Sequence, residues 1–518
     1  MGQSDTESYW LQCMNRGAIS MRRRIVMTLV AICSASNFAF ADGTRDAQPV
    51  TPISPRTDSL RAVRTALNQD IERGQFASVV AGAARGNVVL WLEGLGYADR
   101  ESRIAATPDT IYPVASVSKS LTGTLAAILV RKAKIGWTDE VAHRIPGVAP
   151  GVTVRQTLEQ TSGLPHMWWY EFAASPDSSF GPPQLLSAAR ATAFPPGTGF
   201  IYSNLNFEVA ARYMEVALGE PYETIAAREM WSPLGMRETT SNAWVGRPPV
   251  AAGYTHGNVR VPYVYRLAPR GGAGLFSSAH DLLRFAQFHL GALPNTRDLL
   301  NSASLLDIHG GGTTAGHHDY SHGWGRVEFA GDDFALLADG QELGGAALIL
   351  LLPKHQLAVV LLANTNSDLF ETATGIVEAI ESGVGKQLLQ GMQRLAARWT
   401  AAGILPTGTF SGSLDADGST IALVLDFDAK PDPVLRIGDG APRAISNIEW
   451  DRGILEASVA GDFPLPSDKD RAHELDLALH VGDSTIDGFA TDALSDLKHF
   501  RQYGVPYVIH LSKVTVHE

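Results

Sequence analysis

The most reactive combination of side chains in the sequence is a serine followed three residues later by a lysine, Ser116 and Lys119. On a helix, residues three apart lie on one face, so the hydroxyl and the amine would be neighbours. A serine hydroxyl attacks carbonyl groups well once a base takes its proton, and a lysine desolvated beside apolar side chains can act as that base. Free N–H groups at the helix start would stabilise a developing oxyanion. The pair therefore predicts acyl transfer through a serine nucleophile.

Spacing alone does not distinguish such a pair from an exposed helix start, because Ser-x-x-Lys recurs by chance. The same spacing occurs at Ser495 and Lys498, among acidic residues and without an apolar helix after it. Ser116 instead opens an apolar run that reaches Lys132. A helix of that composition is buried on most sides, so we expect Ser116 to be the nucleophile.

A second polar cluster, Tyr202-Ser203-Asn204, follows a Pro-Pro-Gly-Thr stretch at 195–198. A tyrosine held near a lysine can pass protons as general base and acid, and an asparagine two residues later can bind a carbonyl or position the lysine. An ordinary turn has the same composition. The cluster points to chemistry only together with Ser116 and Lys119.

Five segments of the chain, in this order, resemble those of class C β-lactamases and penicillin-binding-protein-like serine hydrolases. They are ATPDTIYPVASVSK at 106–119, QTSGLP at 160–165, PGTGFIYSN at 196–204, SPLGM at 232–236 and GLFSSAHDL at 274–282. Each is weak alone, but together they are specific, and the resemblance extends from about residue 57 to 383. It implies a β-lactamase/transpeptidase-like α/β (α+β) fold, in which a mixed antiparallel sheet is flanked by helices beside a helical subdomain.

The resemblance also implies roles for single residues. Ser116 would be acylated, Lys119 and Tyr202 would share the proton transfers, and Asn204 would be the polar residue of the second motif. As third motif the family usually has Lys-Thr-Gly, or His-x-Gly in its esterase-like branches, on the strand facing the serine. This chain has Ala338-Asp339-Gly340 there, at the end of a predicted strand.

That departure changes the expected substrate more than the expected reaction. Gly340 keeps the lack of a side chain that lets the backbone approach the serine. The resemblance implies that the second oxyanion donor is a backbone N–H, by position that of Gln341. The cation that helps related enzymes hold a substrate carboxylate is replaced, and Asp339 would repel a carboxylate. We therefore expect a small-molecule ester, or a neutral amide or lactam, to be hydrolysed in preference to penicillins or peptides ending in D-alanine.

Two other interpretations are compatible with the sequence. A β-lactamase, D-Ala-D-Ala carboxypeptidase or D-aminopeptidase would result if a cation from elsewhere reaches the site. A non-catalytic peptidoglycan- or ligand-binding relative is suggested by Ala338, but the intact polar residues of the first two motifs argue against it. The reaction needs no cofactor, and we expect none.

A histidine-rich segment and an aromatic cluster offer further candidate sites. The first consists of His309, His317, His318, Asp319 and His322. No pair in it has a recognised ligand spacing, so we expect no metal. The second, Trp168-Trp169-Tyr170, would either line an aromatic acyl pocket or pack as a buried loop.

The hydrophobic pattern indicates which elements would position these residues. It predicts a helix from Leu60 that ends at Gly74, a hairpin around 85–87, the Ser116 helix, helices at 205–218, 278–290, 369–382 and 386–399, and strands at 334–338, 346–352 and 356–363. The early hairpin and the late strands would have to meet to complete one sheet. We expect a serine hydrolase domain at 59–400 and a separate all-β domain at 404–518, after a disordered leader at 42–58.

The first 41 residues have the pattern of an export signal preceded by about twenty residues that lie upstream of the real translation start. Met21 precedes Arg22-Arg23-Arg24, an apolar run at 25–32 and Ala39-Phe40-Ala41, an order typical of a signal peptide cleaved after Ala41. We expect a periplasmic or secreted protein with no membrane span after processing.

The composition narrows the possible partners and nucleophiles. Both cysteines, Cys13 and Cys33, precede the predicted cleavage site, so a thiol nucleophile and disulfides are excluded from the mature chain. The net charge is -12 and there is no stripe of basic residues, which argues against a nucleic-acid partner. Nothing in the pattern indicates an oligomeric state.

Overall fold

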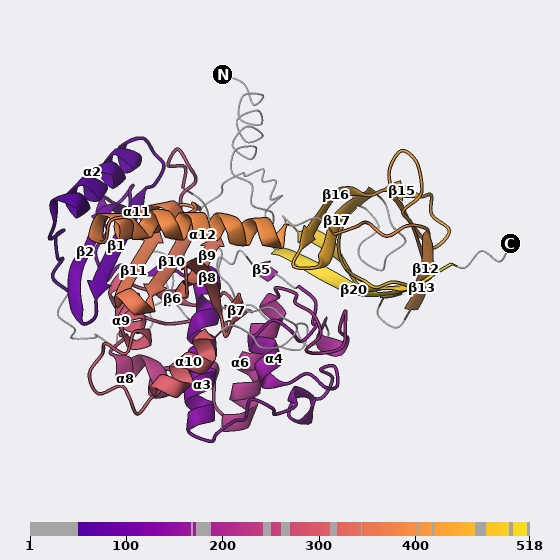
Figure 1. Ribbon diagram of the computed structural model, residues 1–518, viewed down its shortest axis with the longest axis horizontal. Coiled ribbons are helices and arrows are strands. Elements are labelled where there is room, and N and C mark those ends of the chain that lie inside the picture. The colour runs from indigo at the N-terminus through magenta and orange to yellow at the C-terminus, as the bar shows by residue number, and fades with distance from the viewer. Residues whose placement is uncertain are drawn as a thin grey trace, which may run out of the picture. The chain divides into compact units, whose positions relative to one another are not determined.

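The computed structural model describes residues 50–166, 169–171, 188–241, 250–260, 270–310, 319–342, 344–400, 403–416, 419–461, 473–496 and 501–514. The expected signal peptide lies outside these residues and stays a prediction. Residues 50–518 form one compact unit. Figure 1 shows helices packed around a central sheet, and a second sheet formed by the C-terminal part of this unit.

Within the described residues, the central sheet has eight strands in the order β3-β2-β1-β11-β10-β9-β8-β7. They are β1 (Ser78–Arg85), β2 (Val88–Asp99), β3 (Ile104–Ala105), β7 (Tyr320–Ser321), β8 (Trp324–Ala330), β9 (Asp333–Glu342), β10 (Gly345–Leu352) and β11 (Leu357–Ala363). The early hairpin meets the late strands as expected, because β1 pairs antiparallel with β11, with Val79 opposite Ala363. Every residue of β10 and β11 is buried, which explains why both are apolar throughout.

Helices cover both faces of this sheet. They are α2 (Asp58–Glu72), α3 (Ser118–Arg131), α4 (Val154–Leu158), α6 (Asn204–Leu218), α7 (Tyr222–Ala226), α8 (Ser232–Leu234), α9 (Ala279–His289), α10 (Ser302–His309), α11 (Phe370–Ile380) and α12 (Val384–Trp399), with a π-helical turn at Ala227–Trp231. Side chains of α2, α11 and α12 share one core cluster with the sheet. Those of α3, α6 and α9 share the cluster on the other face.

Short elements complete this region. A small two-stranded sheet joins β4 (Tyr112–Pro113) to β6 (Phe276–Ser277). Turns of 3₁₀ helix occupy Ala115–Val117, Val141–His143, Ala188–Arg190 and Pro353–His355. Ser116 therefore lies in a turn just before α3, whereas the sequence predicted it as the first residue of the helix.

The C-terminal region is an antiparallel, barrel-like sheet (Figure 1). Its strands are β12 (Thr409–Ala416), β13 (Ser419–Asp426), β14 (Val434–Ile437), β15 (Arg443–Ala444), β16 (Ser446–Asp451), β17 (Ile454–Gly461), β18 (His473–Val481), β19 (Thr485–Asp496) and β20 (Arg501–Lys513). Strand β5 (Trp169–Glu171), from the middle of the chain, pairs with β20. Alternating apolar residues fill the inside of the sheet. The expected fold class, including the C-terminal all-β region, is confirmed.

Two further findings bear on the sequence predictions. Ala338, Asp339 and Gly340 lie inside β9, which continues to Glu342, so the third motif does not follow the end of a strand as expected. Strand β9 is longer than the predicted strand because its pairing with β10 continues to Glu342, which lies opposite Gly345. None of the described helices has the length and hydrophobicity that a membrane-spanning helix needs.

Candidate active site

The turn that carries Ser116 is held in an unusual backbone conformation. Ala115 has a φ of 44°, in the left-handed region that residues with a side chain rarely adopt. Leu275 fixes the turn on both sides: its carbonyl accepts a hydrogen bond from the Val114 N–H (3.0 Å), and its N–H donates to Ser118 Oγ (3.1 Å). Such strain persists only where the surroundings hold it, and here the two hydrogen bonds to Leu275 hold the turn that contains Ser116.

Lys119 lies buried at the centre of the site, with 1% of its surface exposed. Its Nζ is 2.6 Å from Asn204 Oδ1, 2.8 Å from the Gly272 carbonyl oxygen and 3.1 Å from Ser116 Oγ. The amide and carbonyl oxygens can only accept, so each takes one N–H of the amine. The remaining position faces Ser116, where an uncharged lysine would present its lone pair to the serine hydroxyl.

Tyr202 flanks the same amine. Lys119 Nζ lies 4.7 Å from the centre of the Tyr202 ring, and Tyr202 is half-buried. Its backbone carbonyl oxygen is 2.9 Å from His166 Nδ1, which must therefore donate the proton. Burial lowers the pKa of His166 to about 4, so this histidine is neutral at pH 7. Sequence reasoning missed His166, although it directly follows the QTSGLP segment.

That segment holds the second motif in place. Gln160, which has a φ of 62°, accepts hydrogen bonds through Oε1 from the Ser203 N–H (2.9 Å) and from Asn206 Nδ2 (2.7 Å). The Ser203 hydroxyl donates to the Pro165 carbonyl. Tyr202 and Asn204, on either side of Ser203, are thereby fixed at the start of α6. The structure brings the three motif residues Ser116, Lys119 and Asn204 together.

Strand β9 passes close to the nucleophile at Gly340. A Cβ atom built there would lie 2.4 Å from the Val114 carbonyl oxygen and 2.6 Å from the Ser116 nitrogen, so only glycine fits. Gln341 follows on the same strand, opposite Ala346 of β10. This approach places the β9 backbone beside the Ser116 N–H, where two N–H groups can serve one oxyanion.

The other two residues of the third motif lie in contrasting surroundings. Ala338, at the position of the usual cation, is 3% exposed and belongs to a core cluster. Asp339 is exposed. Ala338 therefore offers no charge to a substrate, whereas the exposed carboxylate of Asp339 offers a negative charge.

Glu208 lies behind Lys119, one turn of α6 after Asn204. Its Oε1 accepts a hydrogen bond of 2.7 Å from the Gly272 N–H, and the carbonyl of the same Gly272 binds Lys119. Burial raises the pKa of Glu208 to about 8. Sequence reasoning missed this residue, because its link to Lys119 runs through a backbone segment that only the fold brings into place.

The histidine-rich segment is part of the packed interior where it is described. His289 Nδ1 is 2.8 Å from His309 Nε2, and burial lowers the pKa values of His309 and His322 to about 3. Among the described residues, no three or more His, Cys, Asp or Glu side chains form a metal-binding group. His317 and His318 lie outside the described residues.

The aromatic cluster is described only in part. Trp168 lies outside the described residues, and the backbone of Trp169 and Tyr170 pairs with Tyr503 and Gln502 of β20. The proposed aromatic acyl pocket therefore stays a prediction.

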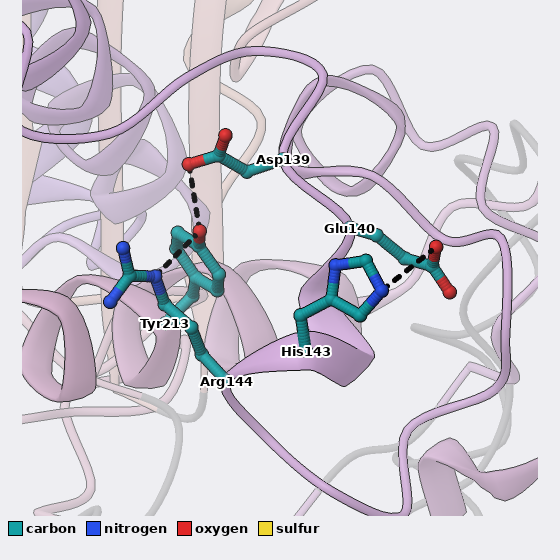
Figure 2. Close-up of a pocket in the computed structure, with 5 residues that line it drawn as sticks. All are labelled: Asp139, Glu140, His143, Arg144 and Tyr213. Atoms are coloured by element: carbon teal, nitrogen blue, oxygen red, sulfur yellow. Dashed lines mark hydrogen bonds and ion pairs between the residues drawn. The ribbon is translucent and has the colours of Figure 1, made fainter.

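A surface pocket elsewhere is lined by Asp139, Glu140, His143, Arg144 and Tyr213 (Figure 2). These side chains interact with one another. The Tyr213 hydroxyl donates to Asp139 (2.8 Å) and accepts from Arg144 Nε (3.0 Å), and His143 lies 3.6 Å from Glu140. Because no residue of the three motifs lines the pocket, we do not assign it to the active site.

Comparison with known proteins finds a matching family model and related bacterial proteins. A family model described as Beta-lactamase matches residues 63–380, more than half of the chain. Protein flp of Staphylococcus aureus (strain MW2) is 26% identical over 329 residues, which cover 60% of this chain and 64% of that protein. Penicillin-binding protein 4* of Bacillus subtilis (strain 168) is 31% identical over 175 residues, covering 32% of this chain and 38% of that protein. The chain thus spans less than two thirds of the length of either relative.

Solved structures share the fold. A class C beta-lactamase has a TM-score of 0.54 at 20% identity, covering 63% of this chain and 98% of that chain. The octameric penicillin-binding protein homologue from Pyrococcus abyssi has a TM-score of 0.54 at 17% identity, covering 88% of this chain and 100% of that one. The family model shows more than the fold: because it matches residues 63–380, the chain belongs to the beta-lactamase family.

Proposed function

We propose that the protein is a serine hydrolase that works through an acyl-enzyme at Ser116, and that it acts on esters in preference to charged lactams or peptides. The observation that carries the proposal is the set of hydrogen bonds around Lys119. Two of them hold the amine against Asn204 and Gly272, and the third joins it to Ser116 Oγ at 3.1 Å. A base fixed next to a serine hydroxyl is what acyl transfer requires.

The proposed reaction has two halves. Ser116 Oγ attacks the substrate carbonyl carbon while its proton passes to Lys119, and Tyr202 shares the transfer of that proton to the leaving alcohol or amine. The backbone N–H groups of Ser116 and Gln341 would bind the oxyanion. Water then attacks the acyl carbon, and the bond between that carbon and Ser116 Oγ breaks. One proton of the water passes through Lys119 and Tyr202 to Ser116 Oγ, and the carboxylic acid leaves.

The preference for esters rests on the third motif. In place of a cation the site has the buried Ala338 and the exposed Asp339. A substrate carboxylate bound there would meet a carboxylate and not a lysine, which weakens binding by like-charge repulsion. A neutral ester escapes that penalty.

A β-lactamase or D-alanyl peptidase activity is the second candidate, and the comparisons favour it. The family model carries the name Beta-lactamase, and one relative is named as a penicillin-binding protein. The ratio of nitrocefin to p-nitrophenyl butyrate hydrolysis separates the two candidates. Faster hydrolysis of nitrocefin by the purified protein would reject the ester preference while leaving the serine mechanism in place.

The nucleophile is tested by replacing Ser116 with alanine. We expect Ser116→Ala to abolish covalent labelling by a fluorophosphonate probe and to leave the circular dichroism spectrum and melting temperature unchanged, because only the Oγ atom is removed. Ser495→Ala, at the other Ser-x-x-Lys of the chain, is the matched control and should label like the wild type. Persistent labelling of Ser116→Ala, or no labelling of the wild type, would refute the proposed function.

Export is a further part of the proposal, based on the order of arginines, apolar run and Ala-x-Ala at 22–41. The exported form would begin at Asp42. Intact mass measurement of the protein from a periplasmic or secreted fraction checks this start.

A further inference from the structure

The turn between β16 and β17 brings a largely enclosed arginine from the C-terminal sheet to the region of the active site. Arg452, in this turn, has a φ of 49° and a side chain that is 11% exposed. Its backbone N–H donates to the Trp399 carbonyl at the end of α12, at 3.2 Å. The turn is thus attached to the helix that covers the central sheet.

The guanidinium of Arg452 packs against two aromatic rings. Its Cζ lies 3.9 Å from the centre of the Trp399 ring and 4.4 Å from that of Phe200. Asp319 Oδ2, which also accepts from Trp399 Nε1, is 3.5 Å from Arg452 Nε. A cation desolvated between aromatic faces is attracted to both rings, so Arg452 holds Phe200 from one side.

From Phe200 the contacts lead to the second motif. Phe200 packs edge-on against Tyr320, with ring centres 5.7 Å apart, and Tyr320 packs edge-on against Tyr202, with ring centres 6.2 Å apart. Tyr320 is buried. The rings form a continuous row from the C-terminal sheet to the tyrosine beside Lys119.

A second set of contacts supports the same segment. Phe194 and Ile201 share a buried cluster with Ile454 of β17 and Phe489 of β19. Phe194 also lies against His480 of β18, with ring centres 5.8 Å apart. The segment that leads into Tyr202 therefore packs on the C-terminal sheet near both of its ends.

We propose that Arg452 is a positioning residue for Tyr202, acting through the row Phe200–Tyr320–Tyr202, so that the C-terminal sheet is a working part of the catalytic site. The inference rests on the proposed serine-hydrolase function for its kinetic readout. Arg452 itself is enclosed by Trp399, Phe200 and Asp319, so its effect falls on the geometry of the tyrosine and not on substrate binding. Without Arg452, Phe200 loses one of the contacts that hold it against Tyr320, and Tyr320 in turn holds the Tyr202 ring less firmly.

The test compares Arg452→Met with the wild type. Methionine keeps the unbranched stem of the side chain, although it is shorter than arginine, and removes the cation. Using p-nitrophenyl butyrate, we expect kcat and the rate of fluorophosphonate labelling to fall about tenfold, because small displacements of a proton-transfer group slow the chemical step strongly. KM should change less than twofold. Arg452→Lys should recover part of the rate, and Arg436→Met, at an exposed arginine of β14, should behave as the wild type.

Coupling between Arg452 and Phe200 distinguishes positioning from a general loss of stability. Phe200→Leu should lower kcat to a similar degree, and the double variant should be no slower than Phe200→Leu alone, because both changes break the same row. Should Arg452→Met fail to fold, Arg452→Lys takes its place. The kcat values of Arg452→Lys, Phe200→Leu and their double variant are then compared in the same way. The inference would be overturned if the decreases in kcat of the two single variants multiply in the double variant. An unchanged kcat in Arg452→Met, or a change confined to its KM, would overturn it as well.

Hydrogen–deuterium exchange gives a readout that needs no turnover. We expect peptides covering 200–204 to exchange faster in Arg452→Met than in the wild type, and Arg436→Met to leave them unchanged. Unchanged exchange at 200–204 in Arg452→Met would overturn the inference even if the wild type hydrolyses nothing. Failure of the proposed function appears separately, as a wild type that the fluorophosphonate does not label.

Discussion

At the scale of single residues, the site is organised around one buried amine. The oxygens of Asn204, Gly272 and Ser116 described around Lys119 all belong to neutral groups. Neutral acceptors orient an amine without stabilising a positive charge as strongly as a carboxylate would. This arrangement suits a lysine that has to exchange a proton with Ser116 in each catalytic cycle.

Glu208 adds a titrating group to this arrangement, and its effect on stability can be predicted. Burial raises its pKa from 4.5 to about 8, so between these values the folded protein keeps a proton that the unfolded chain releases. The stability contributed by this proton is complete below pH 4.5 and is lost as the pH rises through 8. Glu208→Gln stays neutral at every pH. The difference between its free energy of unfolding and that of the wild type should therefore increase, in favour of the variant, by about 1 kcal/mol per pH unit between pH 5 and 8.

Urea unfolding at several pH values measures this difference. Glu72→Gln, at an exposed carboxylate at the end of α2, is the matched control and should follow the wild type throughout. Parallel curves for Glu208→Gln and the wild type would show that Glu208 is ionised across this range, contrary to the prediction.

At the scale of elements, the approach of β9 to the nucleophile turn is the tightest requirement. Gly340→Ala would place a Cβ 2.4 Å from the Val114 carbonyl oxygen, so the strand or the turn must move apart. We expect fluorophosphonate labelling to slow by roughly 100-fold, since a displacement of about 1 Å can have that effect. The melting temperature should also fall.

A glycine on the neighbouring strand provides the control. In Gly325→Ala, on β8, the nearest atom to the new Cβ is the Leu337 carbonyl oxygen at 3.4 Å, an ordinary contact. That variant should be labelled within twofold of the wild-type rate. Wild-type labelling of Gly340→Ala would mean that β9 does not form part of the oxyanion site.

The elements were largely predictable from the sequence, whereas several contacts of the site were not. The spacing of Ser116 and Lys119 already places the hydroxyl near the amine. Continuous apolar runs predicted β10 and β11, and the alternation of apolar residues predicted the C-terminal strands. His166 and Glu208 act through backbone groups of Tyr202 and Gly272, which carry no signal in side-chain patterns. Which chain segments meet these backbone groups is decided by tertiary packing.

At the scale of the whole molecule, the C-terminal sheet and the catalytic region share a buried cluster. Phe489 of β19 is 2% exposed and contacts the cluster that contains Phe194 and Ile201. Removing a buried phenylalanine side chain costs about 3 kcal/mol or more. We therefore expect Phe489→Ala to lower the free energy of unfolding by about this amount, and to speed hydrogen exchange at 193–201 as well as within β19.

An exposed residue of the same strand serves as control. Thr485→Ala, on β19, should leave both stability and exchange near wild-type values. Loss of stability in Phe489→Ala without faster exchange at 193–201 would show that the two regions unfold independently. The position of Arg452 was equally hidden from the sequence, because its turn lies about 250 residues beyond Tyr202 and its partners are set only when the two regions pack.

The pairing of β1 with β11 has a consequence for how the chain folds. Roughly 280 residues separate Val79 from its partner Ala363, and closing so long a loop is entropically costly and slow. During synthesis, β1 and β2 are made long before β11, the strand that pairs with the other side of β1. The nucleophile turn, which needs β9 on the same sheet, can acquire its reactive geometry only after that late closure. Acylation by a fluorophosphonate added during refolding would therefore report the closure of the central sheet.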